Sequence, residues 1–351
     1  MNHEEPDRVP AFESAFTNNT IVRHYGVDPS GGRGYRIMYE FFRKVQIDLV
    51  LSYVSPLPRK HTKPGREYVD EYGRVMKLDF QKDGTLILAY CGGYFNSFED
   101  YESWERPDPN SEKRLKWFFN GRTVQEDLNN DIFSIPATGS LLENPLEGFG
   151  IQTFSRILAH SKQARKIFDE YGNFTLEMVK ILAEKDAQIV LLWDDYGFKN
   201  GLFMKPFYYH EYVLPWLNRI CDAAHKRNCK IMLHSDGDIL EIFEDIVKCG
   251  VDIINPIEPT TNNPDYDIFK LHEKYGDIIT FSGNLSPVLL ALGEISEIKS
   301  YAKKLIFKLA PGGGYLFGSG HSIHPAVTVD RFAAMQNIRR KYGNYPIKVP
   351  D

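Results

Sequence analysis

The sequence predicts an α/β fold, a single (β/α)8 TIM barrel in which residues 1–351 form one domain. Short strand-like runs alternate with amphipathic helical patterns along most of the chain, which is typical of a parallel sheet. There are eight such runs, and this number favours a closed barrel over an open doubly wound sheet. No internal repeat, low-complexity tract or long linker divides the chain.

The eight strand-like runs are short, and helical patterns lie between most of them. In chain order the predicted strands are Val9–Phe16, Ile47–Tyr53, Asp131–Ala137, Gln188–Trp193, Lys230–His234, Asp252–Ile257, Ile278–Ser282 and Gly314–Gly318.

Four helices are predicted from apolar residues at helical spacing. The first, Thr175–Lys185, opens on a threonine, a residue type that suits an N-cap. Gly250 directly follows the third helix and indicates a helix stop before the next strand. The other predicted helices are Tyr212–Arg227, Ile239–Cys249 and Ile295–Leu309.

One segment departs from this alternation. Tyr72-Gly73 and Asp83-Gly84 are hairpin turn signals between alternating runs within residues 66–92. We therefore expect a small antiparallel β insertion after the second barrel strand, within residues 66–128. Its remainder is polar and aromatic, and it either covers part of the barrel mouth or decorates the surface.

Composition excludes several functional classes. A net charge of −5 and a pI near 6.1 give no basic footprint for nucleic acid. No apolar run approaches the roughly 20 residues of a membrane span, and the polar N-terminus does not resemble a signal peptide. The cysteines form no CxxC pair, which fits a reducing cytoplasm. They are Cys91, Cys221, Cys229 and Cys249.

Metal-capable side chains follow three of the predicted strands. His234 and Asp236 follow the fifth strand, Glu258 follows the sixth, and His321 follows the eighth. Because the carboxyl ends of barrel strands form the active site, we expect these side chains to converge. Two imidazoles with one or two carboxylates can hold a divalent cation without any thiolate. Taken singly, each residue also has a structural interpretation, such as a hydrogen-bonded histidine or a glutamate paired with a lysine.

Further candidates lie at the ends of the fourth and seventh strands. Asp194 and Asp195 are adjacent carboxylates that can share a proton and give a base near neutrality, so with His321 they are the predicted catalytic residues. The alternative is that Asp195 binds loop backbone. The predicted substrate-binding residues are Trp193, Tyr196 and Asn284.

Several stretches of the chain resemble the uroporphyrinogen decarboxylase superfamily. The resemblance covers nearly the whole chain and is weakest from about Tyr53 to Leu128. It implies a barrel similar to cobalamin-independent methionine synthase. The matching stretches are Glu5-Pro-Asp-Arg-Val-Pro10, Leu233-His-Ser-Asp-Gly-Asp-Ile239, Ile246-Val-Lys-Cys-Gly-Val-Asp-Ile-Ile-Asn-Pro256 and Leu309-Ala-Pro-Gly-Gly-Gly-Tyr-Leu-Phe-Gly-Ser-Gly-His-Ser-Ile-His-Pro325.

The resemblance also implies a metal site with altered ligands. Methyltransferases of this superfamily bind zinc through a His-x-Cys pair and a later Cys, and a Glu joins them in methionine synthase. His234 matches the histidine, Asp236 the first cysteine, Glu258 the glutamate and His321 the last cysteine. The implied site keeps a metal-binding geometry and loses both thiolates. Nitrogen and oxygen ligands leave a more Lewis-acidic centre, which suits O-demethylation.

The resemblance therefore predicts a zinc-dependent methyltransferase of a corrinoid system. The expected donor is a small methylated compound, a methyl ether among the options, and the expected acceptor is a corrinoid on a partner protein. His234 and His321 are the implied ligands, and Asp236 and Glu258 are either ligands or residues that orient them. The oligomeric state stays open, with a homodimer among the options.

Two other interpretations remain. One is a uroporphyrinogen decarboxylase-type carboxy-lyase, in which Gly320-His321 matches a substrate-binding Gly-His motif. Against it, the Arg-Gln-Ala-Gly-Arg motif of those enzymes is replaced by Phe12–Thr20, which contains no arginine. A substrate with many carboxylates would meet repulsion from Glu13, Asp236 and other acidic residues without enough cations. The other interpretation is a non-catalytic binding relative with a vestigial metal site.

Overall fold

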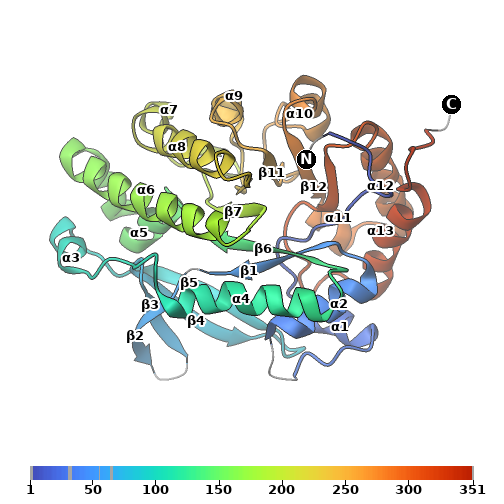
Figure 1. The fold of residues 1–351 in the computed structure, drawn as a ribbon, viewed down its shortest axis with the longest axis horizontal. Coiled ribbons are helices and arrows are strands. Elements are labelled where there is room, and N and C mark those ends of the chain that lie inside the picture. The colour runs from blue at the N-terminus through green and yellow to red at the C-terminus, as the bar shows by residue number, and fades with distance from the viewer. Residues whose placement is uncertain (1–2, 31–33, 55, 64–65, 350–351) are drawn as a thin grey trace.

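The fold is that of a computed structural model, which describes residues 3–30, 34–54, 56–63 and 66–349 (Figure 1). Within this part of the chain, a parallel sheet of seven strands has the order β1-β6-β7-β10-β11-β12-β13. The order follows the sequence, as expected when each strand is added beside the previous one. The strands are β1 (Leu49–Tyr53), β6 (Phe133–Thr138), β7 (Ile189–Trp193), β10 (Lys230–His234), β11 (Ile253–Asn255), β12 (Thr280–Leu285) and β13 (Tyr315–Ser319).

The first predicted strand, Val9–Phe16, forms single bridges instead of a regular strand. Ala11 bridges Phe317 of β13 and Phe12 bridges Leu49 of β1, both in parallel orientation. Pro10 has no N–H to donate to a ladder, although its carbonyl accepts the Phe317 N–H at 2.8 Å. Residues 11–12 therefore connect the two edge strands of the seven-stranded sheet.

Both faces of the parallel sheet are covered, so its strands are apolar along their length. Because successive side chains alternate between faces, Val50 and Val190 belong to the outer layer against the helices. Their neighbours belong to an inner cluster, against which Trp193 packs. Tyr53 and His234 continue the inner alternation at the strand ends. The inner cluster is Phe12, Leu49, Leu51, Ile135, Ala137, Ile189, Leu191, Met232, Ile253 and Leu316.

Helices surround the sheet (Figure 1). They are α1 (Asn19–His24), α2 (Gly34–Val45), α3 (Phe98–Ser103), α4 (Glu112–Asp127), α5 (Glu143–Leu158), α6 (Ser161–Glu184), α7 (Pro206–Tyr208), a π-helical turn η1 (Tyr209–Val213), α8 (Leu214–His225), α9 (Leu240–Lys248), α10 (Ile268–Tyr275), α11 (Pro287–Leu292), α12 (Ile295–Leu309) and α13 (Val329–Tyr342).

The four predicted helices are present at their predicted positions, but one of them, α6, begins earlier than predicted. α12 has the predicted bounds, and α8 and α9 lie within their predicted ranges. α6 begins at Ser161, so the prediction that Thr175 caps it is wrong, and Thr175 is buried inside the helix. The buried stripe continues upstream through Ile167 and Tyr171, and this extends the helix. Gly250 follows α9 with φ of 93°, as a helix stop requires.

A separate antiparallel sheet lies in sequence between β1 and β6. Its strands, in spatial order, are β2 (Pro58–Lys63), β3 (Glu67–Asp70), β4 (Arg74–Phe80) and β5 (Leu86–Gly93). Both predicted turns are present, with Gly73 and Gly84 at φ of 80° and 79°. The antiparallel strands begin at Pro58, before the predicted start at Arg66, because the basic and polar β2 has no apolar alternation to reveal it.

The antiparallel sheet is attached to the parallel sheet through α5. Arg74 at the start of β4 forms an ion pair with Glu147 of α5, with 3.1 Å between Nη1 and Oε2. A small hairpin of β8 (Gly197–Phe198) and β9 (Gly201–Leu202) follows β7. Among the described residues, no helix combines the length and apolar character needed to cross a membrane.

Candidate functional site

His234 ends β10 and is held in one orientation by the neighbouring strands. Its side chain is 2% exposed, and the Trp193 ring stacks on it with centroids 4.1 Å apart. Its Nδ1 lies 2.8 Å from Asn255 Oδ1, and Asn255 Nδ2 donates to Ser282 Oγ at 3.0 Å. Because an amide oxygen only accepts, Nδ1 carries the proton and Nε2 keeps a free lone pair. Strands β10, β11 and β12 thus fix the imidazole through one chain of bonds.

Asp236 lies between two imidazoles. Its Oδ2 is 3.9 Å from His234 Nε2 and 3.3 Å from His321 Nε2. Its Oδ1 is buried and has no hydrogen-bond partner within the described chain. A buried carboxylate oxygen without a partner costs on the order of 1–3 kcal/mol or more. The position is therefore one where a bound cation would satisfy an otherwise orphaned atom.

Asp195 completes a compact group with these residues. One ligand-type atom each of Asp195, His234 and Asp236 lies within 4.8 Å of the other two. Asp195 Oδ1 also accepts the Asp236 N–H at 2.8 Å, which ties the β7 loop to the β10 loop. Burial raises the pKa of Asp195 to about 6; Asp236 adds to this rise and His234 opposes it.

The donor set fits a divalent metal ion. It offers two carboxylates and one imidazole whose ligand-type atoms lie within 4.8 Å of one another, with His321 beside Asp236 on the exposed side. Such nitrogen and oxygen donors suit zinc or a related first-row ion, and the group contains no thiolate. The unpartnered Oδ1 of Asp236 and the free Nε2 of His234 are the atoms best placed to bind it.

Glu258 forms its hydrogen bonds with residues outside this group. Its Oε2 accepts the Gly237 N–H at 2.7 Å, and its Oε1 bonds to the Thr260 hydroxyl. Both oxygens hold the turn that carries Asp236, as expected of a residue that orients a ligand. The group of three contains Asp195 and not Glu258, so metal ligation by Glu258 stays a prediction.

Asp194 forms its hydrogen bonds with the start of α5 and not with Asp195. It is fully buried and accepts the N–H groups of Leu141, Leu142 and Glu143 at 2.7, 3.0 and 2.9 Å. Burial raises the pKa of Asp194 to about 7, and these amides oppose the rise. Asp194 therefore anchors the start of α5, and its contacts give no support to the predicted proton-sharing pair with Asp195.

Two of the three predicted substrate-binding residues are inaccessible. Tyr196 is 0% exposed. Asn284 is 3% exposed, donates to the Ile257 carbonyl at 2.7 Å and accepts from the Tyr301 hydroxyl at 3.1 Å. Their predicted contact with a substrate stays a prediction. Trp193 differs, since it is partly buried at the strand end between His234 and Tyr53, whose ring centroid is 5.8 Å away.

Sequence reasoning missed two residues of this region. Asn255, which orients His234, stands at the end of β11, so a survey of every polar residue at a strand end would have found it. Glu143 begins α5, and its Oε2 accepts the Asp195 N–H at 3.3 Å. Burial, together with Asp195 and Glu147, raises the pKa of Glu143 well above its usual range. No spacing signal connects Glu143 to β7.

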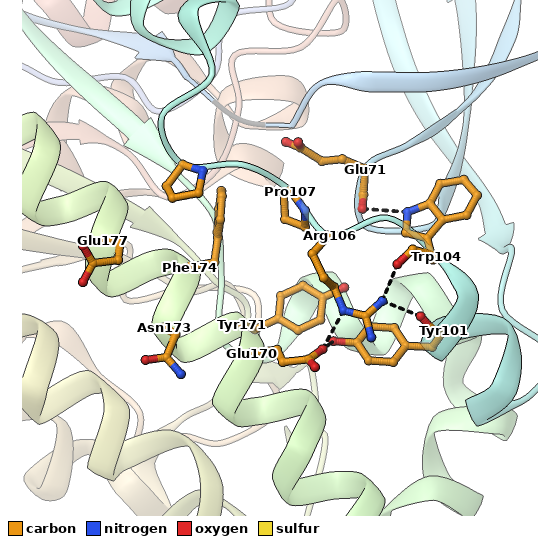
Figure 2. A pocket seen from close by; sticks show the side chains of 11 residues that line it. Glu71, Tyr101, Trp104, Arg106, Pro107, Glu170, Tyr171, Asn173, Phe174 and Glu177 are labelled. Carbon is orange, nitrogen blue, oxygen red and sulfur yellow. Dashed lines mark hydrogen bonds and ion pairs between the residues drawn. The ribbon is translucent and has the colours of Figure 1, made fainter.

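A cavity of about 340 Å³ lies away from these strand ends, between α6 and the loop after α3 (Figure 2). Aromatic rings and prolines form most of its lining. Arg106 Nε is 2.6 Å from Glu170 Oε2, and Trp104 Nε1 donates to the Glu71 carbonyl at 3.0 Å. Each acidic side chain of this lining thus pairs with an arginine or a lysine, in contrast to those around Asp236.

Comparison with known proteins places this geometry in a family. The family model described as uroporphyrinogen decarboxylase matches residues 76–342. Uroporphyrinogen decarboxylase from Thioalkalivibrio sulfidiphilus is 24% identical over 249 residues, which cover 68% of this chain and 67% of that protein. The enzyme of that name from Colwellia psychrerythraea is 25% identical over 237 residues, 64% of this chain and 63% of that protein. The matches thus span about two thirds of the relatives' lengths.

A solved structure shares the fold over almost the whole chain. A methyltransferase from Methanosarcina mazei superposes with a TM-score of 0.70 over 97% of this chain and 96% of that one, at 16% identity. At this identity the likeness concerns the fold alone. The family model covers most of the chain, including β7, β10, β11 and β13, which carry the site. The chain belongs to the uroporphyrinogen decarboxylase family.

Proposed function

We propose that this protein is a metal-dependent methyltransferase that moves a methyl group from a small methylated compound to a corrinoid carried by a partner protein. The observation that carries the proposal is the buried, unpartnered oxygen of Asp236, which lies beside two imidazoles and Asp195. Membership of the family and the fold shared with a methyltransferase support it.

In this proposal Asp195, His234 and Asp236 hold zinc. The ion, when bound, supplies Lewis acidity that draws charge onto the leaving oxygen of the methyl donor. Asn255 fixes the tautomer of His234 so that Nε2 is left to hold the ion, and Trp193 covers the imidazole and keeps water from it. His321, whose side chain is 47% exposed, donates a proton from Nε2 to the departing oxygen.

We also infer that the parallel sheet is part of a complete (β/α)8 barrel, with residues 11–12 in the eighth strand. The parallel bridges from Ala11 to β13 and from Phe12 to β1 support this inference. In such a barrel the antiparallel sheet between β1 and β6 is an insertion. The carboxyl ends of the barrel strands then surround His234 and Asp236, where barrel enzymes place their chemistry.

A carboxy-lyase of the uroporphyrinogen decarboxylase type is the second candidate, because the relatives reported above carry that name. The charges around the site disfavour it. Among the contacts of the described residues, no lysine or arginine bonds to Asp195, His234, Asp236 or His321. A substrate rich in carboxylates needs such cations for recognition.

Metal binding tests the proposal directly. Protein purified without an affinity tag should contain about one zinc ion per chain, and stripped protein should take it up again. His234→Ala and Asp236→Asn should each weaken zinc binding by about 100-fold or more, because each removes a ligand. Asn255→Ala should weaken it by about 10–100-fold, since it only orients a ligand. Calorimetric titration with zinc measures all three.

Asp238→Asn is the matched control. Asp238 stands two residues from Asp236, but its oxygens accept the Leu240 N–H at 3.0 Å and the Asn263 amide at 2.9 Å. Its zinc affinity should equal that of the unchanged protein. Equal affinity in Asp236→Asn would overturn the site assignment.

Activity separates the candidate functions. The zinc-loaded protein should convert cob(I)alamin to methylcobalamin with a methoxyarene as donor, followed by absorbance. Decarboxylation of uroporphyrinogen by metal-free protein would instead establish the carboxy-lyase. Binding of zinc without either reaction would favour a non-catalytic relative.

A further inference from the structure

A cavity of about 630 Å³ opens beside the strand ends, between the N-terminal segment and β1. Helices α2 and α4 and the start of β5 complete its walls. Apart from Glu13, its lining is uncharged and contains no lysine, arginine or histidine among the described residues. The lining residues are Glu13, Ser14, Ala15, Phe16, Thr17, Met38, Phe42, Val50, Leu51, Tyr53, Leu86 and Trp117.

A row of rings connects this cavity to the candidate metal site. Tyr53 lines the cavity, and its ring centroid lies 5.8 Å from that of Trp193. Trp193 in turn stacks on His234 at 4.1 Å. Leu51 of the lining belongs to the inner cluster and Val50 to the outer layer, so the cavity reaches both sides of β1. Two aromatic side chains, Tyr53 and Trp193, stand in line between the cavity and the imidazole.

The one acidic group of the lining is buried, and burial favours its neutral form. Glu13 is 2% exposed, and its carboxyl bonds to the Ser319 hydroxyl, which also bonds to the His321 carbonyl. The Ser319 hydroxyl donates to the carboxyl, and the Ser319 N–H lies 3.3 Å from both of its oxygens. Burial raises the pKa of Glu13 to about 8, and the bonds from Ser319 oppose this rise.

We propose that this cavity binds the uncharged aromatic body of the methyl donor, a methoxybenzene, with its methoxy group directed past Trp193 toward His234 and Asp236. The inference rests on the proposed function and specifies its substrate class. The volume is that of a typical small-molecule site. Phe16, Phe42 and Trp117 offer ring faces and edges to an aromatic ligand.

The same lining rejects anions. A carboxylate on the aromatic ring would lose its water inside the cavity and meet no cation in exchange. Recognition is therefore expected to discriminate between neutral and anionic rings of the same size.

Two probes test this discrimination. Guaiacol is neutral at pH 7, and ortho-methoxybenzoate has a similar shape with a negative charge. In calorimetric titrations the unchanged protein should bind guaiacol, and it should bind the benzoate about tenfold more weakly or worse. Ala15→Phe fills the cavity and should weaken guaiacol binding by about tenfold or more.

Ala159→Phe is the matched control, because Ala159 follows α5 on the surface and does not line the cavity. It should bind guaiacol as the unchanged protein does. Where Ala15→Phe does not fold, Met38→Trp fills the cavity from α2 and replaces it. Tighter binding of the benzoate, or full guaiacol affinity in the filled variant, would overturn the proposal.

Zinc content measured in the same samples separates this inference from the proposed function. The filled variant should keep its zinc, and Asp236→Asn should still bind guaiacol after losing zinc. Zinc binding without guaiacol binding refutes the cavity assignment alone. Guaiacol binding that Ala15→Phe abolishes, in a protein that never binds zinc, refutes the methyltransferase mechanism and supports the cavity.

Discussion

The junction of the antiparallel sheet and the ends of the parallel strands both bury carboxylates, but only the junction supplies them with guanidinium partners. Glu71, after β3, is bonded at both oxygens by Arg114 of α4, at 2.8 and 2.6 Å. Asp70 pairs with Arg74 at 2.7 Å. At the strand ends, Asp236 faces imidazoles and Glu13 faces a serine. Buried acids with fixed cations hold the fold together at the junction, whereas Asp236 has no such cation and keeps one oxygen available to a ligand.

The largest effect should come from breaking a junction pair. Arg114→Met leaves Glu71 buried and uncompensated, and we expect a loss of about 3–5 kcal/mol in the free energy of unfolding. Urea unfolding followed by circular dichroism measures it. Replacing both partners, as in Arg114→Met with Glu71→Leu, should recover most of the loss. A loss below about 1 kcal/mol in the single variant would show that the junction and the strand ends do not differ in this way.

A smaller effect on the free energy of unfolding is expected from Glu13, and it depends on pH. Its folded pKa of about 8 lies above the ordinary value of 4.5, mainly because of burial, while Ser319 and Arg339 oppose the shift. The folded state therefore holds a proton that the unfolded state releases. The resulting stability is complete below about pH 4.5 and is lost as the pH rises through about 8.

Glu13→Gln should remove this pH dependence, because glutamine is neutral at every pH. Between pH 5 and pH 8.5 the unchanged protein should lose on the order of a few kcal/mol more than the variant does. Urea unfolding at several pH values gives the comparison. Parallel pH profiles for the two proteins would mean that Glu13 is not buried as a neutral acid.

The smallest effect on stability should come from an exposed ion pair, which also joins a basic and an acidic side chain. Lys248 and Glu244 lie 2.8 Å apart on α9, with both side chains more than half exposed. Because water and salt screen such a pair, Lys248→Ala should shift the Tm by less than about 2 °C. Differential scanning fluorimetry measures this shift. A change as large as that of Arg114→Met would show that burial does not set the strength of these pairs.

The sequence predicted the parallel strands well because each is a short apolar run covered on both faces. β10 has the predicted bounds, and β7 and β13 start one residue late. β2 was missed because a proline followed by five polar and basic residues gives no apolar alternation. The α6 start was misplaced because a threonine that looks like a cap lies in the middle of the helix.

The sequence predicted where the candidate site lies, but not which side chains bond to one another there. Strand-end positions brought His234, Asp236 and His321 together, as expected for parallel strands whose carboxyl ends meet. Which carboxylate joins them depends on side-chain directions that spacing does not fix. Glu258 turned to the Gly237 amide and Asp195 took its place. Asn255 lies in one of the stretches that resemble the family, but it carries no charge and was not predicted as a partner of His234.

The bonds of the N-terminal segment to β13 also bear on the order in which the protein is made. Ser319 and Glu13 are 306 positions apart in sequence, and contacts of such separation form late in folding. A chain still emerging from the ribosome contains Asp195, His234 and Asp236 before β13 exists. It lacks His321 and the strand to which Glu13 bonds until residues 315–321 have been made. A nascent chain would therefore contain three residues of the candidate metal site before it can hold Glu13 against β13.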